Sequence, residues 1–418
     1  MADRPAAAPR VLFGSFDAER SWAGPGPSAL PALGPGPGTL ALASADELLL
    51  QLCGPGDLLL TNRRMPPELL EDLGPAEAGV TVLTVPGDPA VPVETRLAAQ
   101  NSIDARGFTP APYAVVAETH AAVAALGVSA PLPDFDAVRT VNSKTWSNEF
   151  CLDHDIEGGA RCVDSADDLE REVRALGYPV VLKTAHGVAG RGSLIVTGEP
   201  MLGAVARHLR GHGEAGGDRL LVQRRYERAA DFSAHFDVLD SGDIGPVSFR
   251  GMTNNGLSFA SSDTLDEQLE DRLRDDAEYG RVLAALGKSL RAAGYWGPVC
   301  VDALLAVDGT LVPVLDVNAR LSMGRVGLHL DAAAPARMTR LSFVNLPCAG
   351  EPLDTYHRIR EAVAAAGLEA SVRLLTVSTL QAPVGRCYYA LHADSAAELG
   401  RTDARLREVL ATCRGKVS

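Results

Sequence analysis

Two apolar runs are joined by an Asp-Gly pair in the segment Gly297-Pro-Val-Cys-Val-Asp302-Ala-Leu-Leu-Ala-Val-Asp308-Gly309-Thr-Leu-Val-Pro-Val-Leu-Asp316-Val-Asn318-Ala-Arg320. This pattern predicts two antiparallel strands in a hairpin. Asp316 and Asn318 then share a face, because side chains two residues apart on a strand point the same way, and Asp302 can face them from the partner strand. Three oxygen donors on one face suit a hard cation such as Mg²⁺. The alternative is a hairpin whose polar residues only cover a solvent-exposed face.

A glycine-rich turn lies upstream, between two predicted strands. Tyr178–Lys183 reads as a buried strand that ends in a lysine, and Leu194–Thr197 reads as the returning strand. The turn can close over phosphates, because glycines expose backbone N–H groups without steric conflict. The candidate residues are Gly187, Gly190, Gly192 and Ser193. An ordinary β-turn is the alternative for the loop alone, but a lysine at the end of an apolar strand needs an anion, because burying an unpaired ammonium is costly.

Other polar residues flank the predicted elements. Lys144 begins a predicted helix, where an exposed surface lysine is the alternative to a ligand-binding role. Arg320, just after the hairpin, has the forked guanidinium that suits phosphate oxygens. A further group surrounds the end of a strand and could hydrogen-bond an adenine edge and a ribose, or could form a charged sheet edge: Gln223, Arg224, Arg225 and Asp231.

Composition excludes several classes of protein. The chain has 418 residues, 46% of them hydrophobic, and a net charge of −14, so no basic domain is available for nucleic acid. The seven cysteines are scattered without a CxxC pair, which indicates free thiols in a reducing cytoplasm. No signal sequence and no apolar run of membrane-spanning length is present, so we expect a soluble, cytoplasmic protein. The oligomeric state stays open, with a homodimer among the options.

The order of elements along the chain predicts a mixed α/β protein. Strands at Val11–Ser15, Asp57–Thr61 and Gly79–Val85 alternate with helical stretches and predict a small parallel α/β layer. No GxGxxG follows the first strand, so a dinucleotide-binding fold is not supported. Residues 40–42 could add a strand, and residues 265–293 predict one long helix. After residue 350 the pattern predicts a small tail of helices and strands, with a strand at 372–379.

Together these segments resemble the ATP-grasp superfamily over residues 140–330. The order of the motifs is specific, although no single motif is. The matching residues and segments are Lys144, Val180–Lys183, Gly187–Ser193, Leu221–Tyr226 with Asp231, Asp302, and Leu315–Arg320. The resemblance implies an α/β chain with an α+β ATP-grasp core, in which a nucleotide lies between two α+β subdomains. It also implies ATP and Mg²⁺ as cofactors, with two metal ions that Mn²⁺ could replace.

The resemblance assigns a role to each matching residue. It implies that Lys144 and Lys183 bind the nucleotide phosphates, under a loop that contains Gly187, Gly190, Gly192 and Ser193. It implies that Gln223, Arg224, Arg225 and Tyr226 lie along the adenine, with Asp231 at the ribose. It implies Asp302, Asp316 and Asn318 on Mg²⁺, and Arg320 with Asn318 at the transferred phosphoryl group.

Two positions depart from the superfamily pattern. Asp316 stands where Glu is usual, and it is shorter by one methylene, so the metal could sit differently. Gln223 replaces an acidic residue, which removes a charge and keeps a hydrogen bond. Each position therefore retains an oxygen donor.

The flanks look like those of pheganomycin-type peptide ligases. The similarity lies in Phe13–Trp22, in Ser143–Trp146 and in the small domain after residue 350. It implies three domains: a pre-ATP-grasp-like α/β domain at 1–139, the ATP-grasp core at 140–348, and a small C-terminal α/β domain at 349–418.

The expected activity is that of an ADP-forming carboxylate–amine ligase with an acyl-phosphate intermediate. Its substrates would be small molecules, an amino acid or a short peptide in specialised metabolism, and Arg250 is a candidate for binding the substrate carboxylate. Two alternatives remain open at this stage. The acceptor could be the thiol of a carrier protein, or the chain could be a non-catalytic nucleotide-binding partner of another enzyme.

Overall fold

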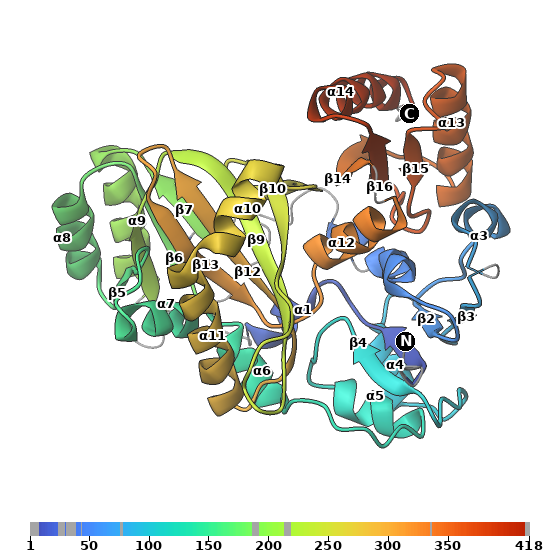
Figure 1. Ribbon diagram of the computed structural model, residues 1–418, viewed down its shortest axis with the longest axis horizontal. Coiled ribbons are helices and arrows are strands. Elements are labelled where there is room, and N and C mark those ends of the chain that lie inside the picture. Colours follow the sequence, from blue (N-terminus) through green and yellow to red (C-terminus); the bar gives the residue numbers. More distant parts are fainter. Residues whose placement is uncertain are drawn as a thin grey trace. The chain divides into compact units, whose positions relative to one another are not determined.

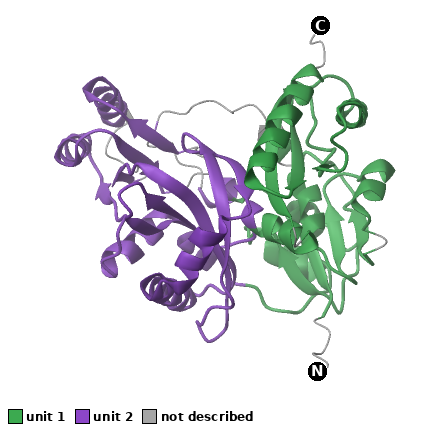
Figure 2. Ribbon diagram, turned by 45° about the horizontal axis from the view of Figure 1, so that its top comes forward, with its two compact units in different colours: residues 1–18, 36–132, 325–418 green, residues 19–35, 133–324 purple. Residues whose placement is uncertain are grey.

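The computed structural model describes residues 8–23, 30, 39–42, 44–75, 78–185, 192–212, 219–334 and 337–413, and Figure 1 labels their helices and strands. The chain divides into two compact units, coloured separately in Figure 2. Unit 1 comprises residues 1–18, 36–132 and 325–418, and unit 2 comprises residues 19–35 and 133–324. In the described part of the chain, no helix has both the length and the apolar character needed to cross a membrane.

Unit 1 begins with the small parallel sheet that the sequence predicts. Its strand order is β3-β2-β1-β4. The strands are β1 (Arg10–Phe13), β2 (Leu58–Thr61), β3 (Thr81–Thr84) and β4 (Thr109–Pro112). β1 and β2 are almost wholly buried, as expected for central strands of a parallel sheet covered on both faces.

Short helices lie between the strands of this sheet, and one more follows its last strand. They are α2 (Thr39–Leu42), η1 (Ala45–Leu52, a 3₁₀ helix), α3 (Pro67–Leu73), α4 (Val93–Ala98) and α5 (Thr119–Ala125). The strand expected at residues 40–42 is therefore wrong, since these residues belong to α2.

Unit 1 also contains an antiparallel group of strands from the C-terminal part of the chain. β16 (Val384–Ala393) pairs with β14 (Met338–Pro347) on one side and with β15 (Val372–Leu374) on the other. The accompanying helices are α13 (Pro352–Ala365) and α14 (Ala396–Thr412), and α14 packs against β14 and β16. The strand expected at 372–379 ends at Leu374, because the turn that follows is bound by a carboxylate from η1.

Glu47 is that carboxylate, and we expect its loss to destabilise unit 1. Its side chain is 1% exposed and accepts the backbone N–H of Val377 (2.7 Å), the N–H of Ser378 (3.0 Å) and the Ser378 hydroxyl (2.7 Å). Glu47→Ala removes the acceptor of all three donors, so the free energy of unfolding should fall by about 2–3 kcal/mol. Urea denaturation followed by circular dichroism measures this change.

Glu47→Gln is the matched control. Burial raises the pKa of Glu47 to about 7, so a neutral group at this position suits the fold. An amide still offers an oxygen to the two N–H groups and an N–H₂ to the hydroxyl, and its stability should stay near that of the wild type. Equal losses in the Ala and Gln variants would contradict the hydrogen-bond explanation.

Unit 2 contains two sheets, of which the smaller has the strand order β5-β8-β6-β7. Its strands are β5 (Arg161–Val163), β8 (Leu220–Arg224), β6 (Val180–Thr184) and β7 (Ser193–Val196). α8 (Ala166–Leu176) and α9 (Glu199–His212) pack against each other and contribute to the same apolar core. Ser165 caps α8, since its hydroxyl accepts the N–H of Asp168 (3.1 Å).

The larger sheet of unit 2 positions the candidate site. Within this unit its strands are β13 (Leu311–Asn318), β12 (Gly297–Ala306), β9 (Arg228–Val238), β10 (Ser248–Asn255) and β11 (Ser258–Asp263), adjacent in that order. β12 and β13 form the antiparallel hairpin predicted at 297–320, and Asp302 lies directly opposite Asp316.

One prediction about the helices of unit 2 is wrong. Apart from the helices that pack on the smaller sheet, the described part of this unit includes four helices. They are α6 (Phe135–Val141), α7 (Lys144–Asp153), α10 (Glu267–Asp275) and α11 (Ala277–Ala292). The single helix expected at 265–293 is therefore two helices. The break falls at Asp276, whose side chain accepts the N–H groups of Glu278 and Tyr279 and so begins α11.

Candidate active site

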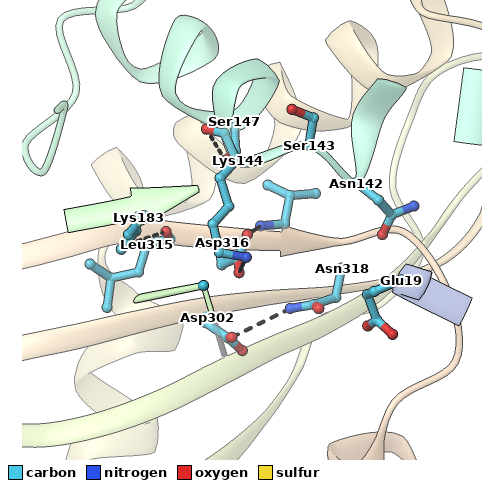
Figure 3. Close-up of polar contacts among 12 residues, drawn as sticks. Glu19, Asn142, Ser143, Lys144, Ser147, Lys183, Asp302, Leu315, Asp316 and Asn318 are labelled. Carbon is cyan, nitrogen blue, oxygen red and sulfur yellow. Dashed lines mark hydrogen bonds and ion pairs between the residues drawn. The ribbon is translucent and has the colours of Figure 1, made fainter. Parts of the chain in front are cut away.

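The three predicted metal ligands lie together on the hairpin. Asp302 is opposite Asp316, and Asn318 donates an amide N–H to Asp302 Oδ2 (3.4 Å) (Figure 3). Burial, and then the neighbouring Asp316 carboxylate, raise the pKa of Asp302 to about 7. Two carboxylates and an amide oxygen are the kind of oxygen-only set that Mg²⁺ prefers, and Lys144 and Arg320 now contact Asp316 and Asn318. Among the described residues, no cluster of three or more His, Cys, Asp or Glu side chains is suited to a metal ion. The role of Asn318 as a third donor stays a prediction.

This set belongs to a row of polar side chains that crosses four strands. The register pairs Arg250 of β10 with Ser233 of β9, Ser233 with Asp302 of β12, and Asp302 with Asp316 of β13. Side chains directly opposite one another in neighbouring strands point to the same face. Arg250 is fully buried and donates to the Ser262 hydroxyl (3.1 Å) and carbonyl (2.8 Å). The structure thus places Arg250 on the face of the metal candidates, and its role with a substrate carboxylate stays a prediction.

A histidine that was not predicted from the sequence lies on the face of the sheet that carries the metal candidates. His235 of β9 lies in the neighbouring row, opposite Cys300, and is 2% exposed. Its Nε2 lies 2.9 Å from the Ser233 hydroxyl and its Nδ1 lies 3.4 Å from the Ser322 hydroxyl. A Cβ at Gly324 would come within 2.4 Å of the imidazole, so that position requires glycine. The alternation of polar and apolar residues along β9 is the sequence signal that could have indicated His235.

The two predicted lysines converge on the hairpin from different elements. Lys144 begins α7, is 8% exposed, and its Nζ lies 2.7 Å from Asp316 Oδ2 (Figure 3). The surface alternative considered for Lys144 is therefore wrong. Lys183 at the end of β6 donates to the Leu315 carbonyl (3.2 Å). Burial lowers the pKa of Lys183 to about 8, although the Asp316 carboxylate opposes this shift.

Lys144 and Lys183 line one pocket together with Gln223. The pocket is also lined by Ser147, Cys151, Leu221, Val314 and Leu315. Asn148 and Ala160 line the pocket as well. The Asn148 amide holds the two residues together, because it donates to the Ala160 carbonyl (3.1 Å) and accepts the Ala160 N–H (2.6 Å). The pocket is thus held by α7, β6, β8 and β13.

The segment after α7 is tied to the strand that carries Gln223. Gln223 donates from Nε2 to the Gly158 carbonyl (2.5 Å), and the Tyr226 hydroxyl donates to Glu157 (2.6 Å). Because a carbonyl oxygen can only accept, the amide of Gln223 must turn its nitrogen to Gly158 and keep its oxygen for another partner. Gly158 has φ +102°, and a Cβ there would meet Val312 at 2.4 Å, so only glycine fits.

The remaining predicted nucleotide contacts are more exposed. Arg224 and Arg225 are exposed at the end of β8, and the Arg224 guanidinium lies 5.4 Å from the centre of the Tyr226 ring. Asp231 pairs with Arg228 (3.0 Å).

The described end of the glycine loop joins β6 to β7. The Gly192 carbonyl accepts the Thr184 N–H (2.7 Å), and Ser193 opposes Lys183 at the start of β7. Gly187 and Gly190 lie outside the described residues.

Arg320 follows β13 and is held by an acidic residue that the sequence analysis did not select. Its Nη2 donates to Glu19 Oε1 (2.5 Å) and to Asn318 Oδ1 (3.1 Å), and its Nη1 donates to the Leu321 carbonyl (3.0 Å). Glu19 belongs to α1 (Ala18–Trp22) and precedes Arg320 by 301 residues in the sequence. The predicted metal ligands and Arg320 therefore form one continuous polar chain in unit 2.

Comparisons with known proteins agree with this architecture. Residues 151–326 match the family model described as the ATP-binding domain of the carbamoyl-phosphate synthase L chain. Carboxyaminoimidazole ribonucleotide synthase from Aspergillus clavatus, complexed with ATP, is 14% identical with a TM-score of 0.53, over 83% of this chain and 96% of that chain. N5-carboxyaminoimidazole synthetase from Staphylococcus aureus is 9% identical with a TM-score of 0.54, over 97% of each chain. L-amino acid ligase from Bacillus licheniformis is 13% identical with a TM-score of 0.50, over 96% of each chain. No curated protein sequence matches the chain.

Over residues 151–326 the chain is similar to that ATP-binding domain, in line with the resemblance noted in the sequence. The similar solved structures confirm the α/β fold class predicted from the sequence. The division into domains at residues 139/140 and 348/349 stays a prediction.

Proposed function

We propose that the chain is an ATP-dependent, ADP-forming ligase that joins a carboxylate to an amine through an acyl-phosphate. The observation that carries this proposal is the convergence of Lys144, Asp302, Asp316 and Asn318, with Arg320 at the end of the same strand. Phosphoryl transfer needs little from a protein beyond position and charge stabilisation, and this arrangement offers both. The L-amino acid ligase among the similar structures supports an amino acid or a short peptide as substrate.

The nucleotide would occupy the pocket between β6, β8 and α7. Lys144 and Lys183 would bind its phosphates, and the free oxygen of Gln223 would accept the adenine amino group. The residues from Gln223 to Tyr226 would follow the adenine, with Asp231 at the ribose, and the loop at 187–193 would close over the phosphates.

The oxygen set of Asp302, Asp316 and Asn318 fits Mg²⁺, because it offers two carboxylates and one amide oxygen at the predicted phosphate end of the pocket. A Mg²⁺ ion held by these residues would supply positive charge to the phosphates. Lys144 at 2.7 Å from Asp316 now supplies positive charge to the same carboxylate.

The reaction would proceed in two steps. A substrate carboxylate attacks the γ-phosphorus of ATP, the bond to ADP breaks, and Arg320 stabilises the charge on the transferred phosphoryl group. The amine then attacks the acyl carbonyl, and phosphate leaves. Exclusion of water would protect the acyl-phosphate between the two steps.

A coupled screen tests this function. The protein, ATP and Mg²⁺ are incubated with pairs of carboxylates and amines, starting with protein-forming L-amino acids, and ADP is measured together with the product mass. We expect ADP release that depends on both substrates, and a product with the mass of an amide. A thioester on a carrier protein, or nucleotide binding without turnover on any acceptor, would overturn the proposal.

The depressed pKa of Lys183 predicts a pH dependence of nucleotide affinity. Only the ammonium form can pair with phosphate, and burial lowers the pKa of Lys183 to about 8 in the free chain. As the pH rises through this value, binding must take up a proton, so the Kd for ATP should increase toward about tenfold per pH unit. Titration calorimetry over a pH series measures this.

Two variants sharpen that measurement. Lys183→Arg keeps the charge over the whole range and should remove the pH dependence, whereas Lys183→Ala should weaken binding at every pH. Unchanged ATP affinity in Lys183→Ala would argue against a phosphate contact.

A further inference from the structure

Glu19 presents an unsatisfied carboxylate oxygen beside Arg320. Its Oε1 accepts from Arg320 at 2.5 Å, and the two side chains are only 12% and 10% exposed. Its Oε2 is buried and has no hydrogen-bond partner in the described part of the chain. Figure 3 shows Glu19 beside Asn318. Glu19 therefore sits next to the place where the acyl-phosphate would form.

A buried carboxylate oxygen without a donor is costly and needs an explanation. The ordinary explanation is that Glu19 only neutralises Arg320. However, one carboxylate oxygen already serves that ion pair, and the other accepts nothing. A ligand that carries N–H donors would satisfy it, and the second substrate of the proposed reaction is an amine.

We propose that Glu19 binds the amine substrate as its ammonium and accepts a proton from it. This inference rests on the proposed ligase function and adds the residue that would prepare the nucleophile. The ligand class is a primary amine, such as the α-ammonium group of an amino acid. An ammonium has no lone pair, so it cannot attack a carbonyl until it loses a proton.

The acyl-phosphate draws the Arg320 guanidinium toward its phosphate oxygens, and Glu19 becomes accessible to the ammonium. One proton moves from the ammonium nitrogen to the Glu19 carboxylate, and the neutral amine forms the C–N bond. The C–O bond to phosphate breaks with its electron pair, and the phosphate leaves. The second proton of the nitrogen is lost to solvent or to the departing phosphate.

Hydroxylamine separates this role from a structural one. It is already neutral near neutral pH, so it attacks an acyl-phosphate without a base and gives a hydroxamate. The protein, ATP, Mg²⁺ and protein-forming L-amino acids are incubated with and without hydroxylamine, and hydroxamates and dipeptides are quantified. In Glu19→Gln, whose amide oxygen can still accept from Arg320, dipeptide formation should fall by about 100-fold or more, in line with general-base contributions. Hydroxamate formation should stay within a few-fold of the wild type.

Control variants make each outcome decisive. Glu118→Gln removes a charge from an exposed glutamate and should change neither product. Glu19→Asp keeps a carboxylate and should restore part of the dipeptide yield, and it replaces the Gln variant if that one fails to fold. Equal losses of both products would show that Glu19 only positions Arg320, and unchanged dipeptide yield would show that it is not the base. Either result overturns the inference while the ligase proposal stands. A wild type that makes neither product overturns the ligase proposal for this substrate class, and the inference with it.

Discussion

Asp316→Ala is expected to reduce ADP formation by at least about 1,000-fold. Its carboxylate faces Asp302 across the hairpin and pairs with Lys144 at 2.7 Å, so it connects the proposed metal site with the phosphate lysines. Loss of a charge-stabilising group at a phosphoryl-transfer site typically removes several kcal/mol, and each 1.36 kcal/mol is about tenfold in rate. The measurement is ADP release at saturating ATP and Mg²⁺, with circular dichroism to show that the chain is folded.

Two further variants separate catalysis from stability at this position. Asp316→Asn keeps one acceptor oxygen, which can serve either Lys144 or the Val317 N–H (3.1 Å), so it should fold better than the Ala variant and be almost as inactive. Asp316→Glu lengthens the side chain by one methylene and tests whether the position of the carboxylate matters to ADP formation. Asp308→Ala, in the exposed turn of the same hairpin, is the control and should be as active as the wild type. Wild-type activity in Asp316→Asn would remove Asp316 from the metal site.

The parts of the site that lie on regular strands were predictable from the sequence. Asp302, Asp316 and Asn318 share a face because side chains alternate along a strand, and the Asp-Gly pair fixed the turn between the strands. Lys183 was found for a similar reason, since a charged residue that ends a buried strand needs a partner.

Contacts between distant segments were not predictable in this way. Glu19 and Arg320 meet across 301 positions, and nothing in the local pattern around α1 marks its glutamate. His235 lies opposite Cys300 only because β9 is inserted next to β12 in the sheet, which is a matter of strand order rather than of local propensity. The break between α10 and α11 was missed because apolar spacing continues across it, although Asp276 is a recognisable N-cap.

Arg320→Ala is the second prediction with a large effect, and it should reduce ADP formation by about 100- to 1,000-fold. Its guanidinium lies just after β13 and contacts Asn318 and Glu19. Removal of one donor to a developing oxyanion costs about 2.7–4 kcal/mol of barrier. Hydroxamate formation measures the first half-reaction, and ATP affinity should be unchanged because Lys144 and Lys183 remain.

Losing Arg320 should lower both the activity and the stability of the protein, and the free energy of unfolding of Arg320→Ala measures the second effect separately. Without the guanidinium, Glu19 would be a nearly buried carboxylate with no cation, and breaking a buried pair on one side costs up to about 3–5 kcal/mol. The double variant Arg320→Ala with Glu19→Ala removes both charges and should recover much of the stability, yet it should stay inactive. If the double variant regained activity as well as stability, Arg320 would be a structural residue, and the charge that stabilises the phosphoryl group would have to come from elsewhere. Arg139→Ala, which removes an exposed arginine of the same unit, is the control for a general effect of lost charge.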